Sequence, residues 1–182
     1  MANDFPELPK QVWIVIISAV VLLILLTSVI VSYNGMVEEE QEVDASWSEI
    51  KNQDQRKIDL IPQLVELLSN YQEFESSTLE NITALRSGYL NATSDKERAN
   101  ISMGLSSMYN EIAFTFEAYP DLQSIEALLG VQDEIAGTEN RIAYSRSRYI
   151  EAVKDYNTKI KKFPGVMTAG MFGFEEKDNL FV

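Results

Sequence analysis

The chain of 182 residues contains no cysteine and no histidine. Without cysteine it has no disulfide, no thiolate nucleophile and no thiolate metal ligand. Without histidine it lacks the commonest general base and metal ligand, which excludes Ser-His-Asp and Cys-His catalytic sites and the HExxH zinc site. We therefore predict no catalytic residue, no cofactor and no metal site, and we expect a protein that is not an enzyme.

Basic residues are also scarce, with 15 Lys and Arg against 28 Asp and Glu and a net charge of -13. A chain of this charge repels phosphate backbones, so nucleic acid is not an expected partner. Anionic lipid headgroups would repel it too, unless an apolar segment inserts among them. The sequence also has no Walker loop, no GxGxxG and no GxSxG motif, which argues against nucleotide-binding and serine hydrolase sites.

One long apolar run, VWIVIISAVVLLILLTSVIV, extends from Val12 to Val31 without a charged residue. About 20 helical residues span ~30 Å, the thickness of the hydrocarbon core of a bilayer. Trp13 and Tyr33 lie near its two ends, where aromatic side chains favour the interface. We predict a short N-terminal tail at 1–11 and a transmembrane helix at 12–33. A cleaved signal peptide is the alternative, but its apolar region is usually shorter and preceded by more basic residues.

The orientation of this anchor follows from few charges. Lys10 precedes the apolar run, whereas Glu38–Glu40 follow it and no basic residue occurs there before Lys51. The positive-inside rule then favours a cytoplasmic N-terminus and an extracytoplasmic domain. Three Asn-x-Ser/Thr triplets beyond the anchor would be glycosylation acceptors on an outward-facing domain.

Beyond the anchor, apolar residues recur at spacings of three and four, which is typical of amphipathic helices. The membrane helix is expected to continue to about Arg56. A second helix is predicted to start at Asp59 and Pro62 and to extend to Tyr89, because Asp can cap a helix and Pro is tolerated in a first turn. A third helix should start at the capping-box pattern Ser94–Glu97 and end at Pro120.

The fourth predicted helix, Gln123–Phe163, is the longest of the domain. A core row repeats every seventh residue: Leu128, Ile135, Ile142, Tyr149, Tyr156 and Phe163. The neighbouring row has smaller side chains, which would let another helix approach closely: Leu129, Ala136, Ala143, Ile150 and Asn157.

Together these patterns predict an all-α fold, in which an N-terminal transmembrane helix continues into an antiparallel up-down-up-down bundle of long helices with coiled-coil-like packing. The bundle domain would occupy residues 34–163. An irregular C-terminal tail rich in Gly, Met and Phe would follow at 164–182.

A polar row interrupts the apolar pattern of the last helix. Glu139 and Arg146 lie two turns apart beside the core row, and Arg86 follows an apolar stripe on the second helix in a similar way. The three residues could form an ionic ligand site between helices, or a partly buried charge network that fixes helix register. We favour the structural polar network, because no residue typical of cofactor binding accompanies them.

Several segments resemble motifs of the LemA family, in the same order and with the same spacing. They are Tyr33–Val37 (YNGMV), Val43–Ile50 (VDASWSEI), Arg56–Val65 (RKIDLIPQLV), Gly137–Ala143 (GTENRIA) followed by Arg146, Asp155–Ile160 (DYNTKI), Phe163–Gly165 (FPG) and Phe172–Phe174 (FGF). The resemblance implies a single-pass protein of a prokaryotic cell membrane, with a long-helix bundle and no known enzymatic activity. Relatives take part in magnetosome formation, and family members are often encoded near HtpX-type zinc proteases, which suggests such a protease as a partner.

Two functional hypotheses follow. The first is a membrane-anchored helical scaffold or adaptor that acts through protein–protein interaction or self-assembly, with the lipid bilayer and other membrane proteins or its own copies as partners. The alternative is an extracytoplasmic four-helix ligand sensor, with a cavity lined by Glu139, Arg146 and Arg86.

Overall fold

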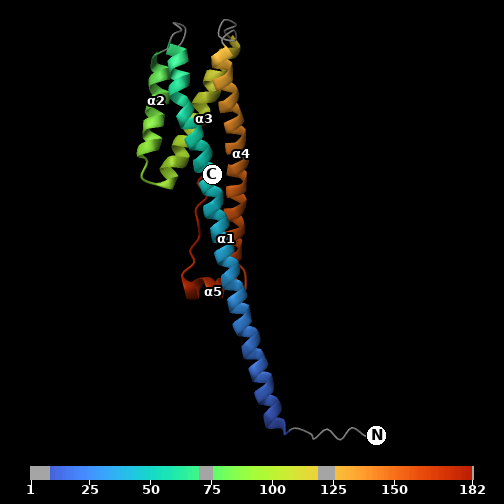
Figure 1. The fold of residues 1–182 in the computed structure, drawn as a ribbon. Coiled ribbons are helices and arrows are strands. Elements are labelled where there is room, and N and C mark those ends of the chain that lie inside the picture. The colour runs from blue at the N-terminus through green and yellow to red at the C-terminus, as the bar shows by residue number, and fades with distance from the viewer. Residues whose placement is uncertain (1–8, 70–75, 119–125, 182) are drawn as a thin grey trace, which may run out of the picture. The chain divides into compact units, whose positions relative to one another are not determined.

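The computed structural model describes residues 9–69, 76–118 and 126–181, with all their side chains except those of 115–118, and these residues form helices and no strand (Figure 1). The helices are α1 (Lys10–Ser69), α2 (Ser76–Asn91), α3 (Asp95–Ala118), α4 (Glu126–Lys161) and α5 (Gly165–Phe172). The predicted all-α class is confirmed. The predicted helix end at Pro120 and helix start at Gln123 lie outside the described residues.

The chain divides into two compact units, each assembled from segments that are distant in sequence. The anchor unit comprises Met1–Gln41 and Lys154–Lys177, and the bundle unit comprises Glu42–Val153 and Asp178–Val182. Helices α1 and α4 contribute residues to both units. The domain boundaries predicted from the sequence, after residues 11, 33 and 163, stay predictions.

In the anchor unit, the apolar part of α1 exposes its large side chains all around the helix, for example Ile17 at 59%, Leu23 at 61% and Val31 at 70%. Within the described residues, α1 is the one helix long and apolar enough to cross a membrane. The Thr27 hydroxyl donates to the Leu23 carbonyl at 2.9 Å, so this polar group is satisfied by its own helix, as a lipid environment requires. The N-terminal part of α1 therefore indicates membrane anchoring.

Helix α5 corrects the prediction of an irregular tail at 164–182. A Cβ atom on Gly165 would lie 2.2 Å from the Lys159 carbonyl oxygen, so the chain can begin α5 at this point only with glycine. Gly173 ends the helix in the left-handed conformation, with φ of 78°, a common role of glycine just past a helix. Two of the three glycines thus mark the ends of a helix and do not disrupt it.

The bundle unit contains four helical segments that alternate in direction, with α1 and α3 antiparallel to α2 and α4 (Figure 1). The start of α3 is as predicted. The Glu97 N–H donates to the Ser94 hydroxyl at 3.2 Å, and the Glu97 carboxylate accepts from the Thr93 N–H at 2.9 Å. The apolar core includes Ile58, Ile61, Leu64, Leu68, Ile82, Tyr89, Leu105, Tyr109, Ile112, Leu128 and Ile135.

The core row of α4 is buried over most of its predicted length. Leu128, Ile135, Ile142, Tyr149 and Tyr156 are each at most 4% exposed. The prediction is wrong for Phe163, which is 80% exposed, because α4 ends at Lys161 and the helical periodicity ends with it.

The predicted helix start at Asp59 and Pro62 is also wrong. α1 runs without interruption through both residues to Ser69, with Pro62 inside it. The single helix predicted from Asp59 to Tyr89 is therefore the end of α1 followed by α2. A proline inside a helix removes one backbone hydrogen bond, and the bundle compensates for that loss as described below.

Candidate functional site

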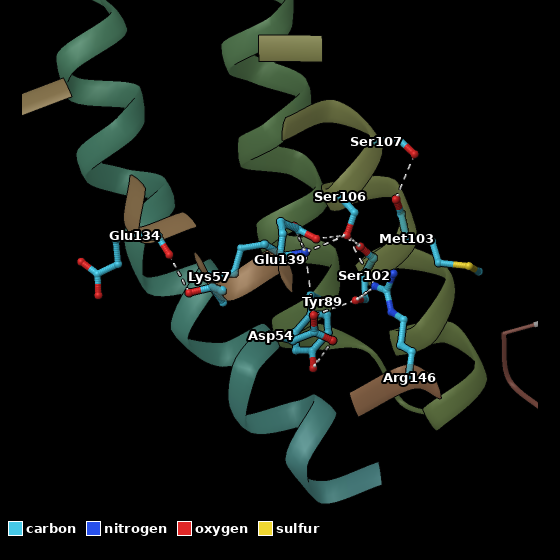
Figure 2. Close-up of polar contacts among 11 residues, drawn as sticks. Asp54, Lys57, Tyr89, Ser102, Met103, Ser106, Ser107, Glu134, Glu139 and Arg146 are labelled. Atoms are coloured by element: carbon cyan, nitrogen blue, oxygen red, sulfur yellow. Dashed lines mark hydrogen bonds and ion pairs between the residues drawn. The ribbon is translucent and has the colours of Figure 1, made fainter. Parts of the chain in front are cut away.

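A buried polar network lies at the centre of the bundle unit. It comprises Asp54 and Lys57 of α1, Ser102 and Ser106 of α3, and Glu139 and Arg146 of α4 (Figure 2). On α1, the inward-facing positions alternate in steps of four and three: Val43, Trp47, Ile50, Asp54, Lys57, Ile61, Leu64 and Leu68. Asp54 and Lys57 thus occupy core positions of an otherwise mainly apolar row, so they are buried by the same packing as their neighbours.

Lys57 is the centre of the network, and its side chain is 2% exposed. Its ammonium group lies 2.8 Å from Glu139 Oε1 and 3.8 Å from Asp54 Oδ1. It also donates to the Ser106 hydroxyl at 3.1 Å, and that hydroxyl in turn donates to Glu139 Oε2 at 2.9 Å. One buried cation therefore faces two carboxylates on two helices.

Asp54 is fully buried and accepts a hydrogen bond from the Ser102 hydroxyl at 2.7 Å. The Tyr89 hydroxyl donates to its second oxygen over a longer distance of 3.5 Å. Burial raises the pKa of Asp54 above its ordinary value, and the Lys57 ammonium opposes that rise. Burial, and then the Asp54 charge, raise the pKa of Tyr89.

Arg146 joins the network from the opposite side of Ser102. Its Nη2 donates to the Ser102 hydroxyl at 2.7 Å, and its guanidinium lies 5.1 Å from the centre of the Phe181 ring, within cation–π range. The Arg146 Nε atom is buried without a hydrogen-bond partner. The C-terminal segment therefore covers the charged end of Arg146 within the bundle unit.

Arg86 does not belong to this network, contrary to the predicted grouping. Its Nε donates to the Ile58 carbonyl oxygen at 3.2 Å. That carbonyl would ordinarily accept from the N–H of residue 62, four residues later, but residue 62 is proline and has no N–H. Arg86 of α2 thus supplies the hydrogen bond that Pro62 removes from α1.

Of the three residues predicted as a polar network, the structure brings together Glu139 and Arg146, which both contact α3 serines. Arg86 bonds the Ile58 carbonyl oxygen instead, so the three residues do not form one cluster. Four members of the network were not predicted from the sequence: Asp54, Lys57, Ser102 and Ser106. The four-three spacing on α1 could have identified the first two, because it places them in the core row.

The chemistry available to the network is limited. Its two carboxylates face a lysine and an arginine, and its hydroxyl groups donate to those carboxylates, so no group is poised as a nucleophile next to a base. Among the described residues there is no cluster of three or more acidic side chains that could hold a metal ion. The arrangement joins α1, α3 and α4 in one register.

A second feature of the bundle unit is the outward face of α4. Its row of Leu129, Ala143 and Ile150 is exposed, with Leu129 at 39% and Ile150 at 38%, and no described helix covers it. A Cβ atom on Gly130 would meet nothing within 4 Å, and one on Gly137 would approach only the Arg141 side chain of the same helix, at 3.6 Å. Neither glycine is required by packing within the described chain.

Beside this face, a groove of about 410 Å³ lies between α1 and α4. Its lining consists of small residues on the floor and charged or aromatic residues at the rim: Ala45, Ser46, Glu49, Arg141, Tyr144, Ser145 and Arg148. Tyr144, which lines this groove, is 67% exposed. We call the outward face of α4, together with the α4 side of this groove, the α4 surface.

These features define a helical-bundle protein with an apolar N-terminal anchoring helix and a network of charged and hydroxyl side chains inside the bundle. Within this class the family is known from the sequence: residues 46–182 match the model of the LemA family, and the chain belongs to that family.

Two kinds of relative illustrate the similarity. The chain is 28% identical over 131 residues to Protein LemA of Metamycoplasma hominis, and the match covers 71% of this chain and 60% of that protein, less than two thirds of its length. It is 22% identical over 191 residues to Magnetosome proteins MamQ 2 and MamQ 1 of Paramagnetospirillum magneticum, covering 91% of this chain and 70% of each relative.

Proposed function

We propose that the protein is a non-catalytic, membrane-anchored scaffold whose bundle unit pairs with a second copy through the α4 surface. The observation that carries the proposal is a pair of glycines on a long helix: a Cβ atom on Gly130 would meet nothing within 4 Å, and one on Gly137 would meet only the Arg141 side chain, at 3.6 Å. Glycine inside a helix costs ~0.5–1 kcal/mol relative to alanine. A close helix–helix approach would explain why this cost is tolerated on an uncovered face.

The apolar row favours an antiparallel pair. In a pair centred between residues 139 and 140, Leu129 faces Ile150 of the second copy and Ala136 faces Ala143. The larger side chains then meet at the two ends, and the small ones meet at the centre, where the backbones approach most closely. The small side chains of this row predict packing with another helix, and in this proposal the second copy supplies that helix.

Charge also favours the antiparallel arrangement. Before residue 140, the exposed charged residues of α4 are Glu126, Asp133 and Glu134. After it, the exposed charges of the bundle-unit part are mainly basic, with Arg141 and Arg148 against Glu151. Glu134 and Arg148 already form ion pairs within the chain, with Arg56 at 2.8 Å and Glu42 at 2.6 Å, so they contribute less to pairing than the other exposed charges. Antiparallel copies place the acidic half along the basic half, whereas parallel copies would align acid with acid.

Because the chain has no cysteine, single introduced cysteines can test the pairing in membranes. Asn140→Cys lies near the predicted two-fold axis and should form a disulfide-linked dimer on oxidation. Leu129→Cys should not form one. In an antiparallel pair the cysteine introduced at position 129 of one copy lies level with residue 150 of the other, so the two introduced cysteines are 21 residues apart along the helix, or ~32 Å, far beyond disulfide reach. Asn110→Cys, exposed on α3, is the control for random collision.

Several results would contradict the proposal. Cross-linking of Leu129→Cys as strong as that of Asn140→Cys would indicate a parallel pair. Cross-linking of Asn140→Cys no stronger than that of Asn110→Cys, together with a monomeric mass by light scattering in mild detergent, would exclude self-association. Co-purification of an HtpX-type protease under the same conditions would instead support the adaptor role that the family resemblance suggests.

The proposal also includes the location of the protein in a prokaryotic cell membrane, with a cytoplasmic N-terminus and an extracytoplasmic bundle. The support is the position of Lys10 before the anchor and of Glu38–Glu40 after it. Protease added to intact spheroplasts should digest the bundle. Full protection there, with digestion only after lysis, would reverse the orientation.

A further inference from the structure

Helix α5 lies beside the end of the apolar run of α1 within the anchor unit (Figure 1). The Phe172 ring centre is 4.9 Å from that of Tyr33, the residue two positions after the run. A cavity of about 280 Å³ is lined on the α1 side by Ser28, Val31 and Ser32, and on the other side by residues around Pro164. α5 is therefore level with residues 28–36 of α1.

The exposed surface of α5 is apolar, and it includes the part of the Phe172 ring that Tyr33 leaves uncovered. Gly165, Thr168 and Ala169 are buried, and the helix contains no charged residue. Its large side chains, with Phe163 just before it, are exposed: Phe163 at 80%, Val166 at 49%, Met167 at 65%, Met171 at 68% and Phe172 at 52%. An exposed apolar patch of this kind on one short segment is typical of a surface that contacts protein or lipid.

The neighbouring part of α1 identifies that environment. Ile30 and Val31 at the end of the anchor are 57% and 70% exposed, and they face the lipid if α1 crosses the membrane. The apolar side of α5 continues this lipid-facing surface sideways at the same level. Aromatic residues concentrate there, which is typical of the boundary between acyl chains and headgroups.

Charged residues flank α5 on both sides and do not interrupt it. Lys161 and Lys162 precede it, and Glu175, Glu176 and Lys177 follow it. Lys161 pairs with Glu176 at 2.6 Å, so the two ends of the segment are held together on its polar side. Lysines in this position can keep their ammonium groups at headgroup level while apolar neighbours insert.

We propose that α5 is an interfacial helix that inserts Phe163, Val166, Met167, Met171 and Phe172 among the lipids at the end of the α1 anchor. This insertion provides a second membrane contact for a chain whose net charge would otherwise repel anionic headgroups. It rests on α1 spanning the membrane and does not depend on pairing of the α4 surface.

The absence of cysteine again permits a direct test. Met171→Cys and Met167→Cys of the full chain are labelled with an environment-sensitive fluorophore and reconstituted into vesicles of phosphatidylcholine and phosphatidylglycerol. Quenching by lipids brominated near the headgroup is compared with quenching by aqueous iodide. Glu176→Cys, which is exposed in the same unit, is the matched control.

The expected result is at least about threefold stronger quenching by brominated lipid at positions 167 and 171 than at 176, and the reverse order with iodide. Iodide quenching at 171 equal to that at 176, without quenching by brominated lipid, would place α5 in water and overturn the inference. Protection from both quenchers would overturn it as well, because protein would then cover the segment. The Cys-free parent chain supplies the circular dichroism reference that verifies folding of each labelled variant.

Discussion

The hydrogen bond from Arg86 to the Ile58 carbonyl can be measured by a double-mutant cycle with Pro62. Arg86→Met removes a charged donor and leaves a carbonyl unsatisfied at a buried residue, Ile58 being 0% exposed. The loss of such a bond costs ~2 kcal/mol. In a Pro62→Ala background, residue 62 regains its N–H and can bond the same oxygen, so Arg86→Met should cost only ~0.5 kcal/mol. The expected coupling energy is therefore ~1.5 kcal/mol.

Urea unfolding of the full chain in mild detergent, followed by far-UV circular dichroism, gives the four stabilities. Arg98 offers a matched control, because its guanidinium donates to the Ala92 carbonyl at 2.8 Å, away from Pro62. Arg98→Met should show no coupling to Pro62→Ala. If Arg86→Met lowers the free energy of unfolding by the same amount in the Pro62 and Pro62→Ala backgrounds, within ~0.3 kcal/mol, then Arg86 does not compensate for the proline.

Two further predictions concern the buried network. Lys57→Met leaves two carboxylates without their cation and should lower the free energy of unfolding by ~3–5 kcal/mol, and adding Glu139→Gln should recover part of this loss. Exposed Lys96→Met, as control, should change it by less than ~0.5 kcal/mol, and an equal effect of the two lysine variants would contradict the network. Burial raises the pKa of Asp54, so the folded chain holds the Asp54 proton more tightly than the unfolded chain. The free energy of unfolding of the wild type therefore decreases as pH rises from the ordinary pKa of the carboxyl group to the raised one. The stability of Asp54→Asn relative to wild type should therefore increase with pH across that window, and a difference that is constant with pH would show that the Asp54 pKa is unshifted.

The sequence was most informative where a periodic pattern repeated over many turns. The apolar run at Val12–Val31 and the core row from Leu128 to Tyr156 are long enough to specify helices without knowledge of their neighbours. The capping box at Ser94–Glu97 is local, and it was found for the same reason. These features were sufficient for the all-α class and for the start of α3 and the core of α4.

The sequence was least informative where a residue depends on a partner far along the chain. Pro62 looked like a helix start because its compensating donor, Arg86, lies on another helix. Asp54 and Lys57 were not identified as buried from the sequence, because burial of a charge is favourable only with Glu139 and the α3 serines in place. The exposure of the α4 surface could not be predicted either, since a row of small residues serves equally well inside a bundle or between copies.

The position of Arg86 on α2 also sets an order of events during synthesis. When α1 leaves the ribosome, its turn around Pro62 lacks one backbone hydrogen bond, and the residue that supplies it has not yet been made. Helices in proteins gain most of their stability from tertiary packing, so the turn of α1 around Pro62 is fully stabilised only when α2 docks against it. The turn of α1 around Pro62 and the part of α2 that carries Arg86 should therefore become stable in one cooperative step, after the preceding part of α1 has formed.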